Sequence, residues 1–161
     1  GGSTWGEVQD VLTLKVNAPA PAPEPIQWPF SMAVPTSDPG HTDIYYVFSG
    51  SAREGTWLIN GQTWSGGVDD EVPLGAELMI ELRNLSPTEH PFHMHGHQFE
   101  VISVDGIAPE HRVMEDTINV AIRQTVRLKM IAENPGYWMI HCHILSHAHK
   151  GMMTLLHVLD D

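Results

Sequence analysis

Hydrophobic and polar side chains alternate along several short stretches of this chain. In residues 77–84, Leu78, Ile80 and Leu82 fall on one side and the intervening positions on the other. Successive side chains of an extended segment point to opposite faces, so this period of two predicts a β-strand with a buried face. The alternation at 11–16 (VLTLKV) predicts another such strand. Short apolar or β-branched segments predict further strands at 44–48, 57–59, 99–104, 125–130, 137–141 and 153–158.

Turn-forming residues separate these predicted strands, and no segment longer than a turn or two has helical periodicity. Asn60-Gly61 is a strong hairpin signal, and residues 144–149 could close one short helical turn. Proline at alternate positions in 18–25 (APAPAPEP) prevents strand pairing and favours an extended connector. That connector either links two structural units or wraps as a loop around one of them. Many short strands with such turns predict an all-β fold, a Greek-key antiparallel β-sandwich.

Length and composition place further bounds on the chain. Its 161 residues suit one domain over 1–161, in which 1–10 are a tag or a frayed start and 18–29 a proline-rich loop. The net charge of -12 argues against nucleic acid as a partner. No apolar run approaches the roughly 18 residues that span a membrane. The single cysteine excludes an internal disulfide.

Histidine is concentrated in two windows, 90–97 and 141–149, which hold eight of the eleven histidines. In the second window Cys142 lies between two histidines, and His147 and Met152 follow at five-residue steps. A thiolate, an imidazole and a thioether, joined by a second imidazole such as His90, make the ligand set of a blue-copper site. Zinc is the main rival metal because it also accepts cysteine and histidine. The thioether argues for copper.

The period of two divides the histidines of both windows in the same way. If 137–143 are extended, Cys142 points to one face while His141 and His143 point to the other. The same rule separates His90 from His93 and His95. Each window therefore offers a ligand to an inner mononuclear site and two histidines to a second site across the backbone.

These windows resemble the copper motifs in the C-terminal cupredoxin domain of multicopper oxidases, laccases among them. The likeness rests on 90–97 (HPFHMHGH) and 141–152 (HCHILSHAHKGM), and extends to 57–61 (WLING), 116–120 (DTINV) and 132–136 (AENPG). The resemblance implies that residues 90–153 contain the copper-binding segments of a cupredoxin domain. The family's spacing between histidine and methionine selects Met152 over Met153 as the axial ligand.

Carried over position by position, the resemblance implies two groups of copper ligands. The first group is the type 1 set: His90, Cys142, His147 and Met152. The second group is the half of a trinuclear site, with a type 2 ligand followed by three type 3 ligands: His93, His95, His141 and His143. The family's trinuclear site takes four more histidines from an N-terminal domain with two further His-x-His motifs. Residues 1–89 contain only His41 and no such motif.

Three functions remain open at this point. The first is the type 1 domain of a laccase-like oxidase, which takes single electrons from a phenol or aromatic amine and passes them through Cys142 to a site that reduces oxygen to water. The second is a freestanding electron-transfer cupredoxin. The third is a homo-oligomer whose copies complete the trinuclear site between them, the alternative to an N-terminal cupredoxin domain as partner. The resemblance also implies an extracellular or periplasmic location.

Overall fold

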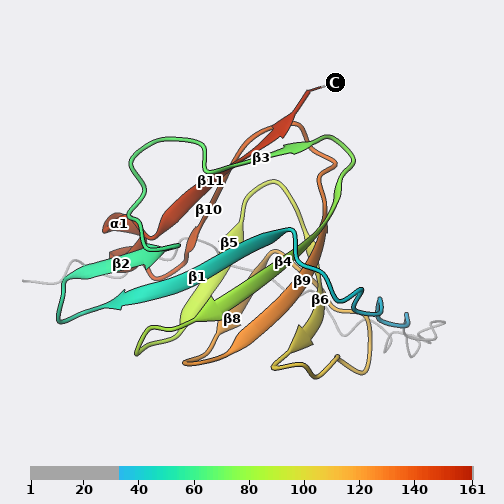
Figure 1. The fold of residues 1–161 in the computed structure, drawn as a ribbon, viewed down its shortest axis with the longest axis horizontal. Helices are drawn as coiled ribbons and strands as arrows, with labels where there is room; N and C mark the ends of the chain where they lie inside the picture. The colour runs from blue at the N-terminus through green and yellow to red at the C-terminus, as the bar shows by residue number, and fades with distance from the viewer. Residues whose placement is uncertain (1–32, 161) are drawn as a thin grey trace, which may run out of the picture. The chain divides into compact units, whose positions relative to one another are not determined.

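Eleven strands and one short helix make up the part of the chain that the computed structural model describes, residues 33–160 (Figure 1). The predicted strand at 11–16, the loop at 18–29 and the start at 1–10 lie outside the described residues. One sheet contains, in spatial order, β2 (Thr56–Ile59), β1 (Ile44–Ser51), β4 (Glu77–Asn84), β9 (Thr125–Ile131), β6 (Phe99–Val104) and β7 (Met114–Glu115). The other contains β3 (Asp70–Pro73), β11 (Met153–Leu159), β10 (Gly136–Cys142), β5 (His90–Met94) and β8 (Thr117–Val120).

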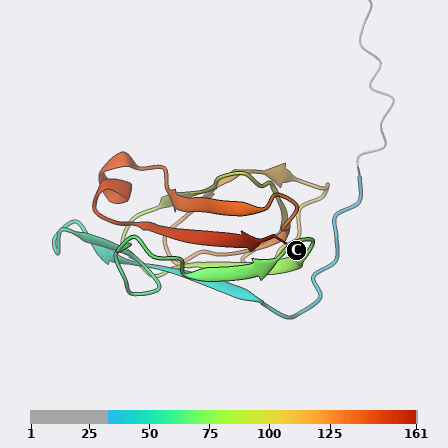
Figure 2. The ribbon, with the colours of Figure 1, turned by 90° about the horizontal axis from the view of Figure 1, so that it is seen from above.

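The strands form two layers, which are visible from above in Figure 2. All neighbouring strands in the described sheets are antiparallel except two pairs, β1–β4 and β3–β11. Each parallel pair joins strands that are separated by other elements, because a parallel neighbour requires a crossover connection. The predicted all-β, cupredoxin-like sandwich is confirmed, with sheets that are mixed at these two pairs.

The hydrophobic core lies between the layers, where alternate side chains of both sheets meet. Leu78, Ile80 and Leu82 of β4 are buried there, as their spacing predicts. The opposite face of β4 is covered as well, since Met79 and Glu81 are also buried. The segment that precedes β1 covers this face of β4. Arg127 reaches across that face, donating to Glu81 at 3.1 Å and to the carboxylate of Asp38 at 2.6 and 2.9 Å.

The Asn60-Gly61 turn forms, but it joins β2 to a single bridge and not to a full strand. Both residues have positive φ, 51° and 75°, and Ile59 and Gln62 exchange backbone hydrogen bonds of 3.0 and 3.1 Å. The chain then leaves the sheet, and the Trp64 amide donates to the Gly151 carbonyl at 2.9 Å. The turn therefore directs its following loop against the second histidine-rich segment.

A short helix, α1 (Leu145–His149), interrupts that segment and confirms the helical turn predicted at 144–149. No helix among residues 33–160 is both long and apolar enough to cross a membrane.

Candidate metal centre

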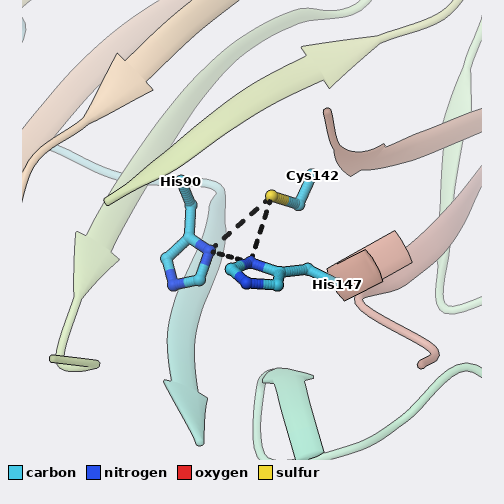
Figure 3. Close-up of side chains that lie close together, drawn as sticks. All are labelled: His90, Cys142 and His147. Atoms are coloured by element: carbon cyan, nitrogen blue, oxygen red, sulfur yellow. Dashed lines mark hydrogen bonds between the residues drawn. The ribbon is translucent and has the colours of Figure 1, made fainter. Parts of the chain in front are cut away.

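Three side chains from separate elements converge at one end of the sandwich (Figure 3). His90 begins β5, Cys142 ends β10, and His147 lies on α1. The Cys142 Sγ is 3.6 Å from the His90 Nδ1 and 3.8 Å from the His147 Nδ1, and the two nitrogens are 3.3 Å apart. Two imidazole nitrogens and one sulfur thus form a nearly equilateral triangle.

The dimensions of this triangle fit a metal at its centre. Bonds of about 2.0 Å to nitrogen and about 2.3 Å to sulfur, at trigonal angles, separate the ligand atoms by roughly 3.5 to 3.7 Å. The three distances in the protein bracket those values. A His2Cys donor set in this arrangement is typical of a blue-copper site.

The loop that carries these residues is wound tightly by its own backbone. The Cys142 amide donates to the Met152 carbonyl at 3.2 Å, and the Met152 amide donates to the His147 carbonyl at 3.0 Å. The Ile144 amide donates to the Cys142 Sγ at 3.4 Å, which directs an N–H dipole at the sulfur. Met152, the predicted axial residue, is fully buried at the end of this loop.

Aromatic rings pack against two of the three candidate ligands, His90 and His147. Trp57 of β2 stacks on His147, with ring centroids 4.0 Å apart and an interplanar angle of 28°. The Trp57 ring also lies edge-on to His90, with ring centroids 5.3 Å apart. Phe48 lies edge-on to His90 as well, with ring centroids 5.6 Å apart. Trp57 is a buried residue of the hydrophobic core, and it contacts the candidate centre as well. The three candidate ligands are all buried, with exposures of 0% for His90, 3% for Cys142 and 8% for His147.

Burial sets the protonation state of this pocket. It raises the pKa of the Cys142 thiol to about 11 and, with a smaller effect from His147, lowers the pKa of His90 to about 4. Burial also lowers the pKa of His147. At pH 7 the metal-free pocket therefore contains a neutral thiol and neutral imidazoles, so a metal must displace the thiol proton.

This displacement gives a measurable prediction. Copper uptake between about pH 7 and pH 10 should release one proton per copper, and apparent affinity should rise about tenfold per pH unit. Below pH about 4, a second proton must leave His90, so affinity should fall more steeply. Calorimetry in buffers of different ionisation enthalpy measures the proton count. Copper uptake without proton release would contradict a thiolate ligand.

A second histidine cluster lies on the outer face of the same sheet. His141 is directly opposite His93 in the β10–β5 pairing, whereas Cys142 is opposite the buried Phe92. The Nε2 atoms of His95 and His141 are 3.0 Å apart, and the His143 ring centroid is 4.7 Å from that of His93. The predicted division of the histidines between two faces is therefore present.

Hydrogen bonds orient two of these rings with Nε2 toward the cluster. The His141 Nδ1 is 3.0 Å from the Cys142 carbonyl oxygen, to which it can donate. The His93 Nδ1 is 2.9 Å from the Asp116 carbonyl oxygen and 2.8 Å from the Thr117 hydroxyl. Burial, reinforced by His93 and the other neighbouring histidines, lowers the pKa of His95. Contacts of this kind at Nδ1 orient a histidine ring to bind metal through Nε2.

Several residues that orient these rings were not singled out in the sequence. Ser86 contacts the His90 Nε2 at 2.6 Å, and Asp116 and Thr117 hold His93. Asp116 and Thr117 begin the 116–120 motif, so that motif could have indicated that they lie near the site. Ser86 had none, because its contact depends on how the loop 85–89 closes. His97, another histidine of the first window, is buried against Trp138.

Sequence comparison relates this chain to copper enzymes. The sequence model described as "Multicopper oxidase" matches residues 35–161. Multicopper oxidase MmcO of Mycobacterium tuberculosis is 36% identical over 119 residues, which cover 74% of this chain and 23% of that protein. L-ascorbate oxidase of Cucurbita pepo var. melopepo is 37% identical over 120 residues, which cover 67% of this chain and 21% of that protein. The chain thus spans less than a quarter of either relative.

Solved structures agree with this relationship. A multicopper oxidase from Pediococcus acidilactici superposes with a TM-score of 0.70 at 29% identity, over 81% of this chain and 29% of that chain. A multicopper oxidase from Campylobacter jejuni, described as a metallo-oxidase, gives a TM-score of 0.68 at 30% identity, over 74% and 31%. The fold, the copper-type donor set and the match over residues 35–161 lead to one conclusion: the chain belongs to the multicopper oxidase family.

Proposed function

We propose that this chain is the type 1 copper domain of a laccase-like multicopper oxidase. Family membership makes copper its cofactor. The observation that carries the proposal is the buried triangle of His90, Cys142 and His147, whose donor atoms are 3.3 to 3.8 Å apart. Met152, buried at the end of the same loop, would be the fourth residue to hold the copper.

Copper held there would supply one-electron transfer. The chain's own residues determine how an electron could arrive and leave. Among the three candidate ligands of the triangle, His147 has the greatest exposure, at 8%, so we propose its edge as the point where a reductant donates. The reductant class is a phenol or aromatic amine, and the net charge of -12 favours neutral or cationic members of it.

The proposed way out is the backbone around Cys142. Its sulfur belongs to the triangle, while its chain neighbours His141 and His143 belong to the outer cluster. The hydrogen bond from His141 to the Cys142 carbonyl adds a second connection of 3.0 Å. Cys142 therefore joins the two clusters within one short covalent path.

We further propose that His93, His95, His141 and His143 are half of the trinuclear site that reduces oxygen to water. An N-terminal cupredoxin domain or another copy of this chain would provide the other half. This accords with a chain that spans less than a quarter of its relatives. An extracellular or periplasmic location, and the organisation of 1–161 as one cupredoxin domain, belong to the same proposal.

Substitution of His95 separates these arrangements from a freestanding electron carrier. His95→Ala removes an exposed outer ring whose Nε2 lies 3.0 Å from that of His141. We expect the blue absorption to persist and any copper beyond one per chain to be lost. If copies of the chain complete the site, oligomer size should fall as well, which light scattering measures. A variant with unchanged metal content and size would count against the homo-oligomer, and loss of the blue band would contradict the separation of the clusters.

A further inference from the structure

A buried asparagine holds the loop that precedes His90. Asn84, at the end of β4, is fully buried. Its amide nitrogen donates to the carbonyl oxygens of Thr88, Val120 and Ala121 at 2.7, 3.0 and 3.1 Å. Its carbonyl oxygen accepts from the Ser86 amide at 2.9 Å. One side chain thus joins the loop 85–89 to the connection between β8 and β9, and fixes where Ser86 lies.

The Ser86 hydroxyl is placed between this loop and His90. Its oxygen is 2.9 Å from the Thr88 carbonyl oxygen, to which it donates its only proton, and it accepts from the Thr88 amide at 3.3 Å. The His90 Nε2 lies 2.6 Å from the same oxygen. With the hydroxyl proton on the Thr88 carbonyl, the contact with His90 is made by a proton on Nε2, which the hydroxyl oxygen accepts.

A proton on Nε2 leaves the other ring nitrogen bare. That nitrogen, the His90 Nδ1, is the one that faces Cys142 and His147 in the triangle. The opposite tautomer would direct an N–H group into the position of the metal. Groups that hydrogen-bond the far nitrogen of a ligating histidine fix its tautomer and raise its basicity.

We propose that Ser86, held by Asn84, is a positioning residue that presets the metal-binding tautomer of His90. The inference rests on the proposed function only in taking His90 as a copper ligand. Ser86 touches neither the reductant nor oxygen, and acts through His90 alone.

The tautomer is measured directly in copper-free protein by long-range 1H–15N correlation on 15N-labelled histidine. We expect His90 to have a protonated Nε2 and a bare Nδ1. In Ser86→Ala the second tautomer should appear, and copper affinity should fall roughly ten- to a hundredfold. The reduction potential of the bound copper should rise, because a less basic imidazole stabilises the oxidised ion less well.

Two variants control for effects on packing. Ser86→Thr keeps the hydroxyl and should restore the wild-type tautomer, whereas Ser103→Ala removes a buried serine of β6 and should change nothing. A proton on Nδ1 in the wild-type protein would overturn the proposal. So would a Ser86→Ala protein with unchanged tautomer and affinity. Absence of a blue band together with the expected tautomer would contradict the proposed function and leave this inference standing.

Discussion

Replacing Cys142 with serine is expected to abolish the blue absorption of the copper-loaded protein. Serine keeps nearly the same shape in a pocket where the side chain is 3% exposed, so the fold should survive. Its hydroxyl cannot supply the thiolate that gives a blue-copper site its colour. The affinity of the triangle for copper should fall by on the order of a hundredfold or more. This loss is larger than the one expected when only a hydrogen bond to a ligand is removed, as in Ser86→Ala. Visible spectra and competitive copper titration measure both effects.

The matched control for this variant is His143→Ala. His143 directly follows Cys142 in the chain, but its ring lies with the outer cluster. This variant should keep the blue band and the first equivalent of copper. A blue band that survives Cys142→Ser would show that the colour arises elsewhere.

The second large effect is expected for Trp57→Ala. Trp57 is 4% exposed and its ring stacks on His147 at 4.0 Å. Truncating a buried aromatic residue of this size costs about 3–5 kcal/mol of unfolding free energy. Urea unfolding of the copper-free protein measures this loss without any contribution from the metal. The His147 ring also loses its cover, so the blue band of the loaded protein should weaken or shift.

Trp64→Ala provides the comparison, because Trp64 lies on the neighbouring loop and its indole donates only to the Gly67 carbonyl, at 3.0 Å. Its loss should cost much less stability and leave the spectrum unchanged. Equal destabilisation by the two substitutions would contradict the structural role assigned to the Trp57 ring.

The division of histidines between two sites could be predicted from the sequence because it depends on local geometry alone. Side chains alternate across a strand, so Cys142 and His141 must face opposite ways once the segment is extended. Pairing of β10 with β5 then brings His141 opposite His93. The same period predicted the buried face of β4. For these two segments, the expectation and the fold agree.

What escaped prediction depends on contacts between distant segments. Glu81 reads as a solvent-facing residue, yet it is buried because Arg127 spans the sheet to reach Asp38. The strand β3 (Asp70–Pro73) has only four residues, of which two are acidic, and it is extended because it pairs with β11. Ser86 lies in a loop without periodicity, and its place beside His90 depends on Asn84, whose amide also binds the distant carbonyls of Val120 and Ala121. Long-range contacts of this kind leave no pattern in one sequence.

The most direct test of the central claim is copper per chain in the copper-loaded protein, taken with its visible spectrum and its mass in solution. A type 1 centre formed by His90, Cys142 and His147 predicts an intense blue band that saturates at one copper per chain in a monomer. More copper per chain in an oligomer, with the same band, would mean that the outer half-sites have met, and oxygen reduction should then be assayed. Copper that binds without a blue band would contradict the assignment.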